Sequence, residues 1–115
     1  MSSDCLFCGI VAGTVPATFV RRDDDIVAFR DVNPQAPTHV LVVPAQHIES
    51  AAELTPAHDQ VWARLLHVAQ SIAEEEGLDD DGYRMVVNVG RNGGQTVGHL
   101  HLHLLGGRQL TWPPG

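Results

Sequence analysis

Short apolar runs alternate with polar turns over the first half of the chain. Residues 5–13 carry apolar side chains at helical spacing and end at Gly13, which predicts a short helix. Residues 18–22 and 25–31 are two β-like runs on either side of an acidic turn, which predicts a hairpin. Residues 39–43 are rich in β-branched side chains and stop at a proline, so we expect a third strand there.

One later stretch has the periodicity of a long amphipathic helix. Thr55 is suited to the position before the first helical residue, and Pro56 to the first helical position. Apolar side chains then recur at helical spacing up to Gly77: Val61, Leu65, Val68 and Ile72. Glutamates occupy residues 74–76, where they oppose the helix dipole, so we expect this end of the helix to be well solvated.

Two more β-like runs, residues 83–89 and 98–105, flank a glycine-rich turn at residues 90–94. The strands follow one another mostly in hairpin-sized steps, and no linker or internal repeat divides the chain. The pattern therefore predicts a single α+β domain over residues 1–115, with a five-stranded antiparallel sheet, one long helix and one short helix.

The composition argues against a protein that binds nucleic acid or a membrane. The 115 residues include 7 Arg, no Lys and 14 Asp plus Glu, for a formal charge of −7, and 5% are aromatic. Nucleic acid is bound mainly through clustered basic and stacking aromatic side chains, so we expect no nucleic-acid partner and no membrane partner. No apolar run approaches the ~20 residues of a membrane-spanning helix. Without a signal peptide or a disulfide framework, we expect a cytoplasmic protein with reduced thiols.

Three histidines, His99, His101 and His103, alternate with leucines. Successive side chains of a strand point to opposite faces, so we expect the imidazoles to share one face, about 7 Å apart, and the leucines to face the core. A half-exposed strand that carries histidine by chance is one interpretation. Burying the ring nitrogens without partners would cost about 1–3 kcal/mol each, which argues against chance.

Two functional interpretations of this row remain, metal ligation and catalysis by an imidazole. A hydrolytic metal site normally recruits carboxylates, but residues 90–115 contain no Asp or Glu. Residues 93–96, Gly-Gly-Gln-Thr, offer backbone N–H groups and a hydroxyl that suit phosphate oxygens. Together the two segments favour a phosphoryl-type substrate.

Residues 99–105 resemble the His-φ-His-φ-His-φ-φ motif of the histidine triad superfamily, in which φ is apolar. Further segments in the same order are similar to the HINT branch of that superfamily: residues 29–31, 34–39, 83–88, 93–96, 105–109 and 112–115. The resemblance covers essentially the whole chain. It implies a HIT fold that pairs into a two-fold dimer.

The HINT resemblance implies a purine nucleoside phosphoramidase, a hydrolase that cleaves the P–N bond of AMP or GMP phosphoramidates. His101 matches the nucleophile, which forms a nucleotidyl-histidine that water then hydrolyses. His103 matches a donor to the phosphate, and His39 matches a histidine that supports the nucleophile through hydrogen bonding. Thr96 stands where the HINT pattern usually has Ser, and it keeps the hydroxyl that assists the leaving amine.

The same resemblance implies a nucleotide site. Asp31 matches a carboxylate that accepts hydrogen bonds from both ribose hydroxyls, and Asn88 matches an amide beside the phosphate. The other expected substrate-binding residues are Phe7, Ile10, Phe29, Arg30, Val32, Gly94, Gln95, Thr96 and His103. Arg30 departs from the histidine that is common at its position. The alternative for the apolar members is ordinary core, and for the polar members a structural role.

Cys5 and Cys8 have the C-x-x-C spacing of a zinc knuckle, which needs two further ligands. By resemblance to zinc-bearing members of the superfamily, these ligands are His47 and His99. Four protein ligands leave no open position, so we expect a structural Zn²⁺ that the chemistry does not require. Two inert thiols are the alternative, and a thioredoxin-like pair is disfavoured because Cys5 lies too near the terminus to follow a strand.

The resemblance also places the tail at a dimer interface, with Trp112 as its anchor, and we expect residues 57–76 and 83–88 to form the two-fold contact. Two other functions remain open. One is a dinucleoside polyphosphate hydrolase of the fragile histidine triad branch, whose triad tends to run into Pro-Arg where residues 105–108 here are Leu-Gly-Gly-Arg. The other is a nucleotide-binding adaptor with little turnover.

Overall fold

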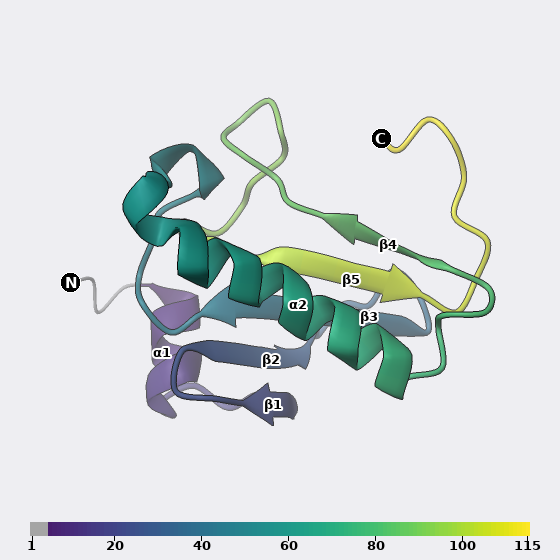
Figure 1. The fold of residues 1–115 in the computed structure, drawn as a ribbon, viewed down its shortest axis with the longest axis horizontal. Helices are drawn as coiled ribbons and strands as arrows, with labels where there is room; N and C mark the ends of the chain where they lie inside the picture. Colours follow the sequence, from purple (N-terminus) through teal and green to yellow (C-terminus); the bar gives the residue numbers. More distant parts are fainter. Residues whose placement is uncertain (1–4) are drawn as a thin grey trace.

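Five antiparallel strands form one sheet in the order β1-β2-β3-β5-β4 (Figure 1) in the computed structural model, which describes residues 5–115. The strands are β1 (Phe19–Arg22), β2 (Ile26–Arg30), β3 (Thr38–Pro44), β4 (Tyr83–Val86) and β5 (Leu102–Gly106). Every neighbouring pair is antiparallel. The predicted sheet is confirmed, and β3 lies at its centre, with all of its residues buried.

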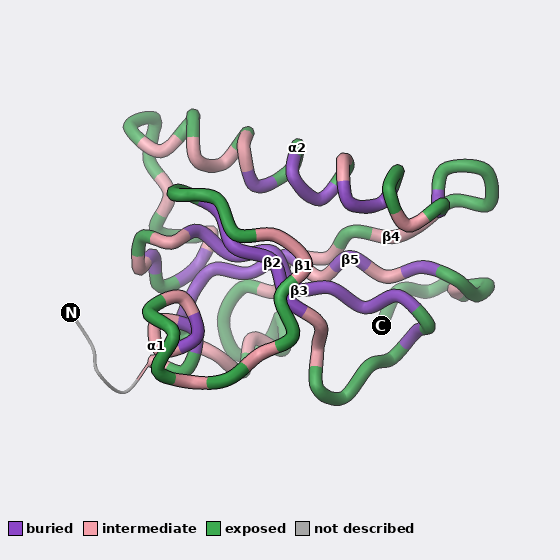
Figure 2. Tube along the Cα trace, turned by 90° about the horizontal axis from the view of Figure 1, so that it is seen from below, coloured by how far each residue is buried: buried purple, intermediate pink, exposed green. Residues whose placement is uncertain are grey.

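Two helices cover opposite faces of the sheet (Figures 1 and 2): α2 (Asp59–Glu75) crosses one face and α1 (Leu6–Ala12) packs on the other. Strand residues alternate between these two cores because successive side chains point to opposite faces. The core under α2 contains Ile26, Ala28, Val40, Val42, Leu102 and Leu104, and the core under α1 contains Val27, Phe29, Leu41 and Val43. Complete burial of one aliphatic side chain stabilises the folded state by about 1.5–3 kcal/mol relative to leaving it exposed.

Helix α1 is short but has a cap at each end. The Cys5 thiol accepts the backbone N–H of Cys8 at the start, and Gly13 ends the helix in the left-handed region at φ +85°. Its buried residues, Phe7 and Ile10, face the sheet. The helix therefore holds the cysteine pair and Phe7 on the face of the sheet opposite α2.

The last two strands are shorter than the sequence predicts. β4 ends at Val86 instead of residue 89, and β5 begins at Leu102 instead of residue 98, so His99 and His101 precede the strand. β5 starts late because the backbone N–H of Leu100 donates to the carbonyl of Ile48 at 2.6 Å. Leu100 therefore does not pair with β3. His99 and His101 therefore lie before the sheet ladder begins, while His103 is a residue of β5.

The long helix begins later than the sequence predicts. Thr55 caps a 3₁₀ turn, η2 (Pro56–His58), which follows a first 3₁₀ turn, η1 (Ala51–Glu53), and α2 begins only at Asp59. At the other end, the expectation of a well-solvated terminus is confirmed, since Glu74, Glu75 and Gly77 are exposed. Glu75 pairs with Arg21 at 3.0 Å, and Glu76 pairs with Arg30 at 3.0 Å, so two strands anchor this end of the helix. Within residues 5–115 no helix is long and apolar enough to cross a membrane.

Candidate active site and metal centre

The three histidines of the alternating motif lie in a continuous row on the α1 face of the sheet. The ring centroids of His101 and His103 are 5.0 Å apart, and the Phe7 ring lies 5.1 Å from His101 and 6.0 Å from His99. His99 is 0% exposed and His101 is 5% exposed. The intervening leucines are buried in the core under α2, as the alternation predicts.

Among residues 5–115, the His101 ring has a hydrogen-bond partner on one of its two nitrogens only. Its Nδ1 lies 2.7 Å from the carbonyl oxygen of His99, and since a carbonyl can only accept, Nδ1 carries the proton and donates it. The Nε2 atom of the neutral ring therefore holds an unshared electron pair. This is the state in which an imidazole attacks an electrophile.

His39 and His103 are linked by hydrogen bonds whose direction is also determined. The backbone N–H of Gln35 donates to Nδ1 of His39 at 3.0 Å, so the proton of the neutral His39 ring is on Nε2. This Nε2 lies 2.9 Å from Nδ1 of His103 and 3.4 Å from Oδ2 of Asp31. His103 accepts at Nδ1 and keeps its own proton on Nε2. The chain of bonds thus makes His103 a donor.

Burial keeps this group of rings neutral. Desolvation lowers the pKa of His103 to about 4, with the neighbouring His101 and His39 rings adding to the effect. Desolvation also lowers the pKa of His39, against an opposing effect of the Asp31 carboxylate. At neutral pH both rings are uncharged, and the hydrogen-bond directions derived above apply.

Side-chain amides brace the loop that approaches the histidine row. Asn88 Nδ2 donates to the carbonyl of Gly93 at 2.6 Å, and Gln95 Nε2 donates to the carbonyls of Glu49 and Val97 at 2.9 Å. A Cβ on Gly93 would meet backbone atoms of Val89, so a larger residue cannot adopt this turn. Asn88 and Gln95 hold the loop in place, and the expected hydroxyl, that of Thr96, is exposed on it.

The other expected substrate residues are spread over several environments. Phe7, Ile10 and Phe29 are buried under the histidine row, and the Phe7 and Phe29 rings pack edge to face at 5.4 Å. Val32 is 98% exposed at the end of β2. Beside it, Asp31 accepts the backbone N–H of Asn33 at 2.8 Å and lies next to His39.

Arg30 lies on the opposite face of the sheet from the histidines. It alternates with Phe29 along β2, and its guanidinium forms a two-pronged hydrogen bond with the Glu76 carboxylate, both distances being 3.0 Å. This contact lowers the pKa of Glu76. The structure therefore does not bring Arg30 together with the other expected substrate residues.

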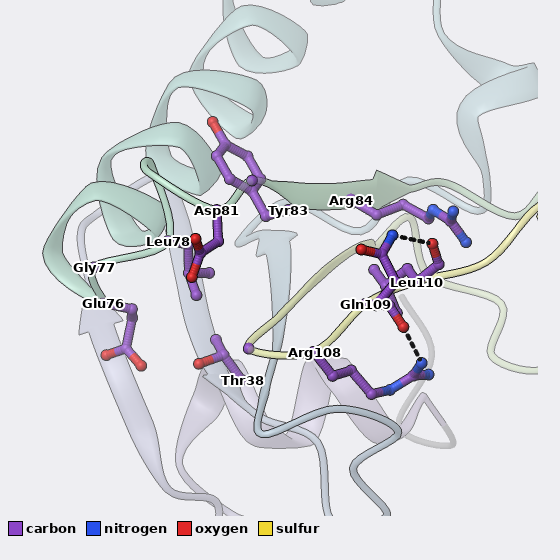
Figure 3. Close-up of a pocket in the computed structure, with 12 residues that line it drawn as sticks. Thr38, Glu76, Gly77, Leu78, Asp81, Tyr83, Arg84, Arg108, Gln109 and Leu110 are labelled. Atoms are coloured by element: carbon purple, nitrogen blue, oxygen red, sulfur yellow. Dashed lines mark hydrogen bonds between the residues drawn. The ribbon is translucent and has the colours of Figure 1, made fainter.

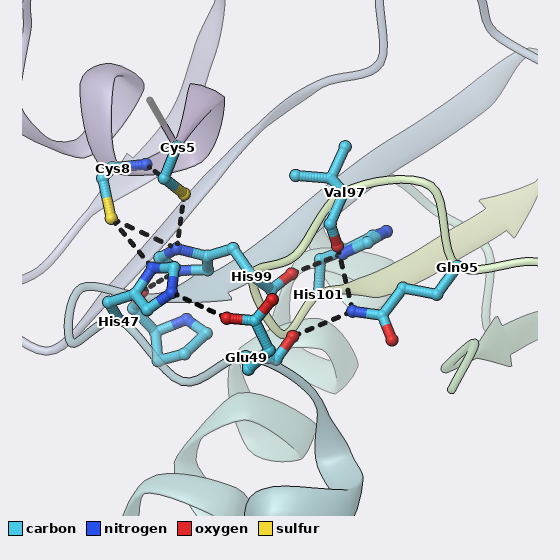
Figure 4. A network of polar contacts seen from close by, with 9 residues as sticks. Cys5, Cys8, His47, Glu49, Gln95, Val97, His99 and His101 are labelled. Carbon is cyan, nitrogen blue, oxygen red and sulfur yellow. Dashed lines mark hydrogen bonds and ion pairs between the residues drawn. The ribbon is translucent and has the colours of Figure 1, made fainter. Parts of the chain in front are cut away.

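Cys5, Cys8, His47 and His99 bring two thiols and two imidazoles together (Figure 4), with all four ligand atoms within 4.8 Å of one another. The Nδ1 atom of His47 lies 3.1 Å from Cys8 Sγ, and Nδ1 of His99 lies 3.4 and 3.5 Å from the two sulfurs. Tetrahedral zinc, with bonds of about 2.0–2.3 Å, places its ligands at similar separations.

The other ring nitrogens of these two histidines form contacts that orient both rings for metal binding. His99 Nε2 donates to the carbonyl of Pro44 at 2.9 Å, and His47 Nε2 lies 3.3 Å from the Glu49 carboxylate. Both rings then direct an unprotonated Nδ1 at the thiols, which is the usual outer-shell arrangement of a metal-bound histidine. Burial and the adjacent Cys5 raise the pKa of the Cys8 thiol to about 11. The donor set fits Zn²⁺.

Two residues that contribute to the site cannot be recognised from the sequence. Gln35 acts through its backbone N–H, which every residue except proline has. Glu49 acts through its carboxylate on His47, and a single acidic residue two positions from a histidine is too common to single out. Tertiary structure alone identifies them.

A hollow of about 760 Å³ lies elsewhere, between the end of α2, the start of β4 and the residues after β5 (Figure 3). Glu76, Asp81, Arg84 and Arg108 border it, and none of the candidate catalytic histidines does. A second hollow of about 440 Å³ borders the metal centre and includes Thr96.

Comparison with known proteins identifies the family. The HIT domain family matches residues 12–110. The chain belongs to the HIT family. This HIT protein is 44% identical to the purine nucleoside phosphoramidase of Escherichia coli strain K12 over 110 residues, which cover 96% of this chain and 92% of that one.

Two further relatives extend the comparison. This HIT protein is 46% identical to the 14 kDa zinc-binding protein of Zea mays over 115 residues, covering 98% of this chain and 89% of that one. The crystal structure of a HIT family hydrolase from Legionella pneumophila has a TM-score of 0.96 and 52% identity, covering 97% and 100% of the two chains. The HIT fold expected from the sequence is confirmed, and the family includes hydrolases.

Proposed function

We propose that this HIT protein is a purine nucleoside phosphoramidase, which hydrolyses the P–N bond of AMP or GMP phosphoramidates. The observation that carries the proposal is the state of His101. Its Nδ1–H is occupied by the His99 carbonyl, and its Nε2 electron pair is free beside a neutral donor, His103. A nucleophile and a donor at this separation suit attack on phosphorus followed by stabilisation of the phosphoryl oxygens.

In the first half of the reaction, Nε2 of His101 forms a bond to the α-phosphorus while the P–N bond breaks. The bonding pair stays on the leaving nitrogen, which takes up a proton, with the hydroxyl of Thr96 as the proposed donor. Nε2–H of His103 donates to a non-bridging phosphoryl oxygen, where negative charge increases in the transition state. The product is a nucleotidyl-histidine and a free amine.

In the second half, water attacks the same phosphorus and the P–N bond to His101 breaks. The bonding pair returns to Nε2, the proton lost by water restores the Thr96 hydroxyl, and the nucleoside monophosphate leaves. An imidazole suits both halves because it is a good nucleophile when neutral and a good leaving group from phosphorus. No step needs a metal ion.

The nucleotide is proposed to lie along the histidine row with its ribose at Asp31. The carboxylate of Asp31 is at the end of β2, and only one of its oxygens accepts the Asn33 N–H, which leaves capacity for the ribose hydroxyls. Phe7, Ile10, Phe29 and Val32 are proposed to contact the base. Asn88, Gly94 and Gln95 are proposed to shape the phosphate side of the site.

We also propose that Cys5, Cys8, His47 and His99 hold a structural Zn²⁺. The ion supplies a cross-link between α1 and the segments that carry the two histidines, and all four of its positions are taken by protein ligands. Metal analysis of protein purified without a histidine tag should find one zinc per chain and unreactive thiols. Zinc well below one per chain, with both thiols freely titratable, would contradict the proposal.

The proposed activity is tested by release of AMP from adenosine 5′-phosphoramidate. Wild type should turn over, while His101→Ala should release no AMP above the enzyme-free control and still bind AMP. His103→Ala should retain a reduced rate, about 10²-fold to 10³-fold lower, as expected for loss of a hydrogen-bond donor to the charge that develops in the transition state. Binding without turnover in wild type would indicate an adaptor, and cleavage of dinucleoside polyphosphates alone would indicate the other branch.

A further inference from the structure

His99 belongs to two sites at once. Its ring directs Nδ1 at the sulfurs of Cys5 and Cys8, at 3.4 and 3.5 Å, and donates Nε2–H to Pro44. Its backbone carbonyl accepts the Nδ1–H of His101 at 2.7 Å. The side chain that is proposed to hold the metal and the carbonyl that selects the tautomer of the nucleophile are thus parts of a single, fully buried residue.

Helix α1 makes a second connection between the same two sites. Phe7 lies between the two cysteines in the sequence, and its ring packs edge to face on His101 at 5.1 Å and 87°. The same ring contacts His99 and Phe29. Fixing the two sulfurs therefore also fixes the ring that bounds one side of the nucleophile.

We propose that the metal centre positions the nucleophile, with His99 and Phe7 as positioning residues. When Zn²⁺ is bound, the His99 carbonyl and the Phe7 ring keep His101 in the Nδ1–H tautomer with Nε2 free. When it is lost, the His99 ring has only weak thiol partners on its Nδ1 side, so it can change tautomer or rotate and release the Pro44 contact. The attached carbonyl then moves relative to His101.

A small displacement is enough to affect the rate. Misplacing a reacting group by about 1 Å can cost about 100-fold in catalysis. The reaction proposed above passes no electrons or protons through the ion, so the effect acts through geometry alone. We expect the rate of nucleotidyl transfer to fall about tenfold or more without zinc, while the KM for the phosphoramidate changes little.

Zinc titrations of wild type and Glu49→Gln test the inference. Among the described residues, the Glu49 carboxylate hydrogen-bonds to His47 and to neither His99 nor His101, so the variant weakens zinc affinity and keeps all four ligands. At fixed pH, ¹⁵N-labelled histidine reports the His101 tautomer, and single-turnover mixing reports nucleotidyl transfer. Both signals should follow zinc occupancy, and in Glu49→Gln their midpoints should shift together to higher zinc by about tenfold or more.

A second variant tests the connection through α1 without removing the metal. Phe7→Leu should keep one zinc per chain and still lower the single-turnover rate at saturating phosphoramidate, where weaker contact with the base no longer matters, because the ring beside His101 is missing. The inference is overturned if zinc-free protein that is folded by circular dichroism keeps the single tautomer and the full rate. It is also overturned if both signals are lost only as the chain unfolds.

The rate measurement rests on the proposed function, but the tautomer measurement does not. If zinc-loaded wild type shows no turnover, the phosphoramidase proposal fails, while the tautomer comparison still decides whether the metal centre positions His101. If turnover is present and the tautomer is independent of zinc, the phosphoramidase proposal stands and the coupling fails.

Discussion

Single hydrogen bonds decide which nitrogen of each ring is available. A carbonyl fixes the proton of His101 on Nδ1, and the backbone N–H of Gln35 fixes the proton of His39 on Nε2. His39 in turn directs the remaining proton of His103 outward. The proposed division of roles between nucleophile and donor rests on these contacts, because the three side chains are chemically identical.

The depressed pKa of His103 predicts a pH dependence of stability. Its pKa falls from 6.5 to about 4 on folding, so between these values the unfolded chain binds a proton that the folded chain does not. Above pH 6.5 the neutral His103 ring costs the folded protein no free energy of unfolding. The free energy of unfolding falls as the pH drops from 6.5 toward 4, and this loss does not grow further below pH 4. Between pH 7 and 5, wild type should lose more unfolding free energy than His103→Gln, by about 1 kcal/mol after allowing for partial exposure.

Denaturant unfolding of both proteins at equal zinc loading measures this difference. The remaining histidines, His39 and His99 among them, are present in both proteins, so their contributions largely cancel. Equal pH slopes for the two proteins would show that His103 is not held neutral by the fold.

At the residue scale, the sequence predicts the chemical side chains well and their partners poorly. The alternation of His99, His101 and His103 is a local pattern, so the row can be predicted from the spacing of the residues. The backbone groups of Gln35 and His99 that set the proton positions have no residue-type signal. Glu49 reaches His47 through tertiary structure alone.

Among the elements, the end of α2 connects the helix to the sheet through two ion pairs. Arg21 of β1 bonds to Glu75, and Arg30 of β2 bonds to Glu76 through both nitrogens of its fork. Two-pronged Arg–carboxylate pairs are the more specific kind of surface ion pair. The glutamates at this end of the helix interact unfavourably with the helix dipole. The arginines of the two strands offset this effect.

Arg30→Met should separate this structural role from substrate binding. We expect a loss of about 1 kcal/mol of unfolding free energy, because the Glu76 contact disappears. We expect kcat/KM for the phosphoramidate to stay unchanged, because Arg30 lies on the face opposite the histidines. Glu76→Gln is the matched control and should lose a similar free energy. A large fall in kcat/KM for Arg30→Met alone would instead support the substrate-binding role expected from the sequence.

The elements themselves could be predicted from periodicity, but several of their ends could not. The run at residues 98–105 alternates perfectly, yet β5 starts at Leu102 because Leu100 bonds to Ile48. The Thr55-Pro56 pair is a correct start signal, but it begins a 3₁₀ turn that precedes α2. Such ends depend on distant backbone partners that a local pattern does not contain.

On the scale of the whole molecule, β4 is an edge strand, and we propose that it forms a two-fold contact together with α2. An edge strand has unpaired backbone groups on one side, which suit pairing with a second copy. Met85 on β4 is 43% exposed, and Leu66 on α2 is 37% exposed. Met85 lies opposite Leu104 in the sheet and so faces the α2 side.

Met85→Glu should weaken the homodimer by placing a charge in this apolar contact. Light scattering coupled to size exclusion should show a shift from dimer to monomer on dilution. Leu6→Glu is the control, since Leu6 is exposed on α1, away from β4, and should leave the mass unchanged. A monomeric wild type, or a Met85→Glu dimer as stable as wild type, would contradict the proposed interface.

The tail makes limited contact with its own chain. Arg84 donates to the carbonyl of Thr111 at 2.8 Å, while Trp112 is 82% exposed. Deleting residues 109–115 should therefore change unfolding free energy little and change the relative rates for different leaving amines more. Rates measured over a series of amines test this expectation. Unchanged relative rates, with a large loss of stability, would show that the tail is merely structural.

The most direct test of the central claim is to trap the covalent intermediate on His101. Wild type mixed with adenosine 5′-phosphoramidate and quenched in alkali should carry one adenylyl group on the peptide that contains residues 99–108. His101→Ala should carry none, although it binds AMP as wild type does. Turnover by wild type without such an adduct, together with activity of His101→Ala, would contradict the account.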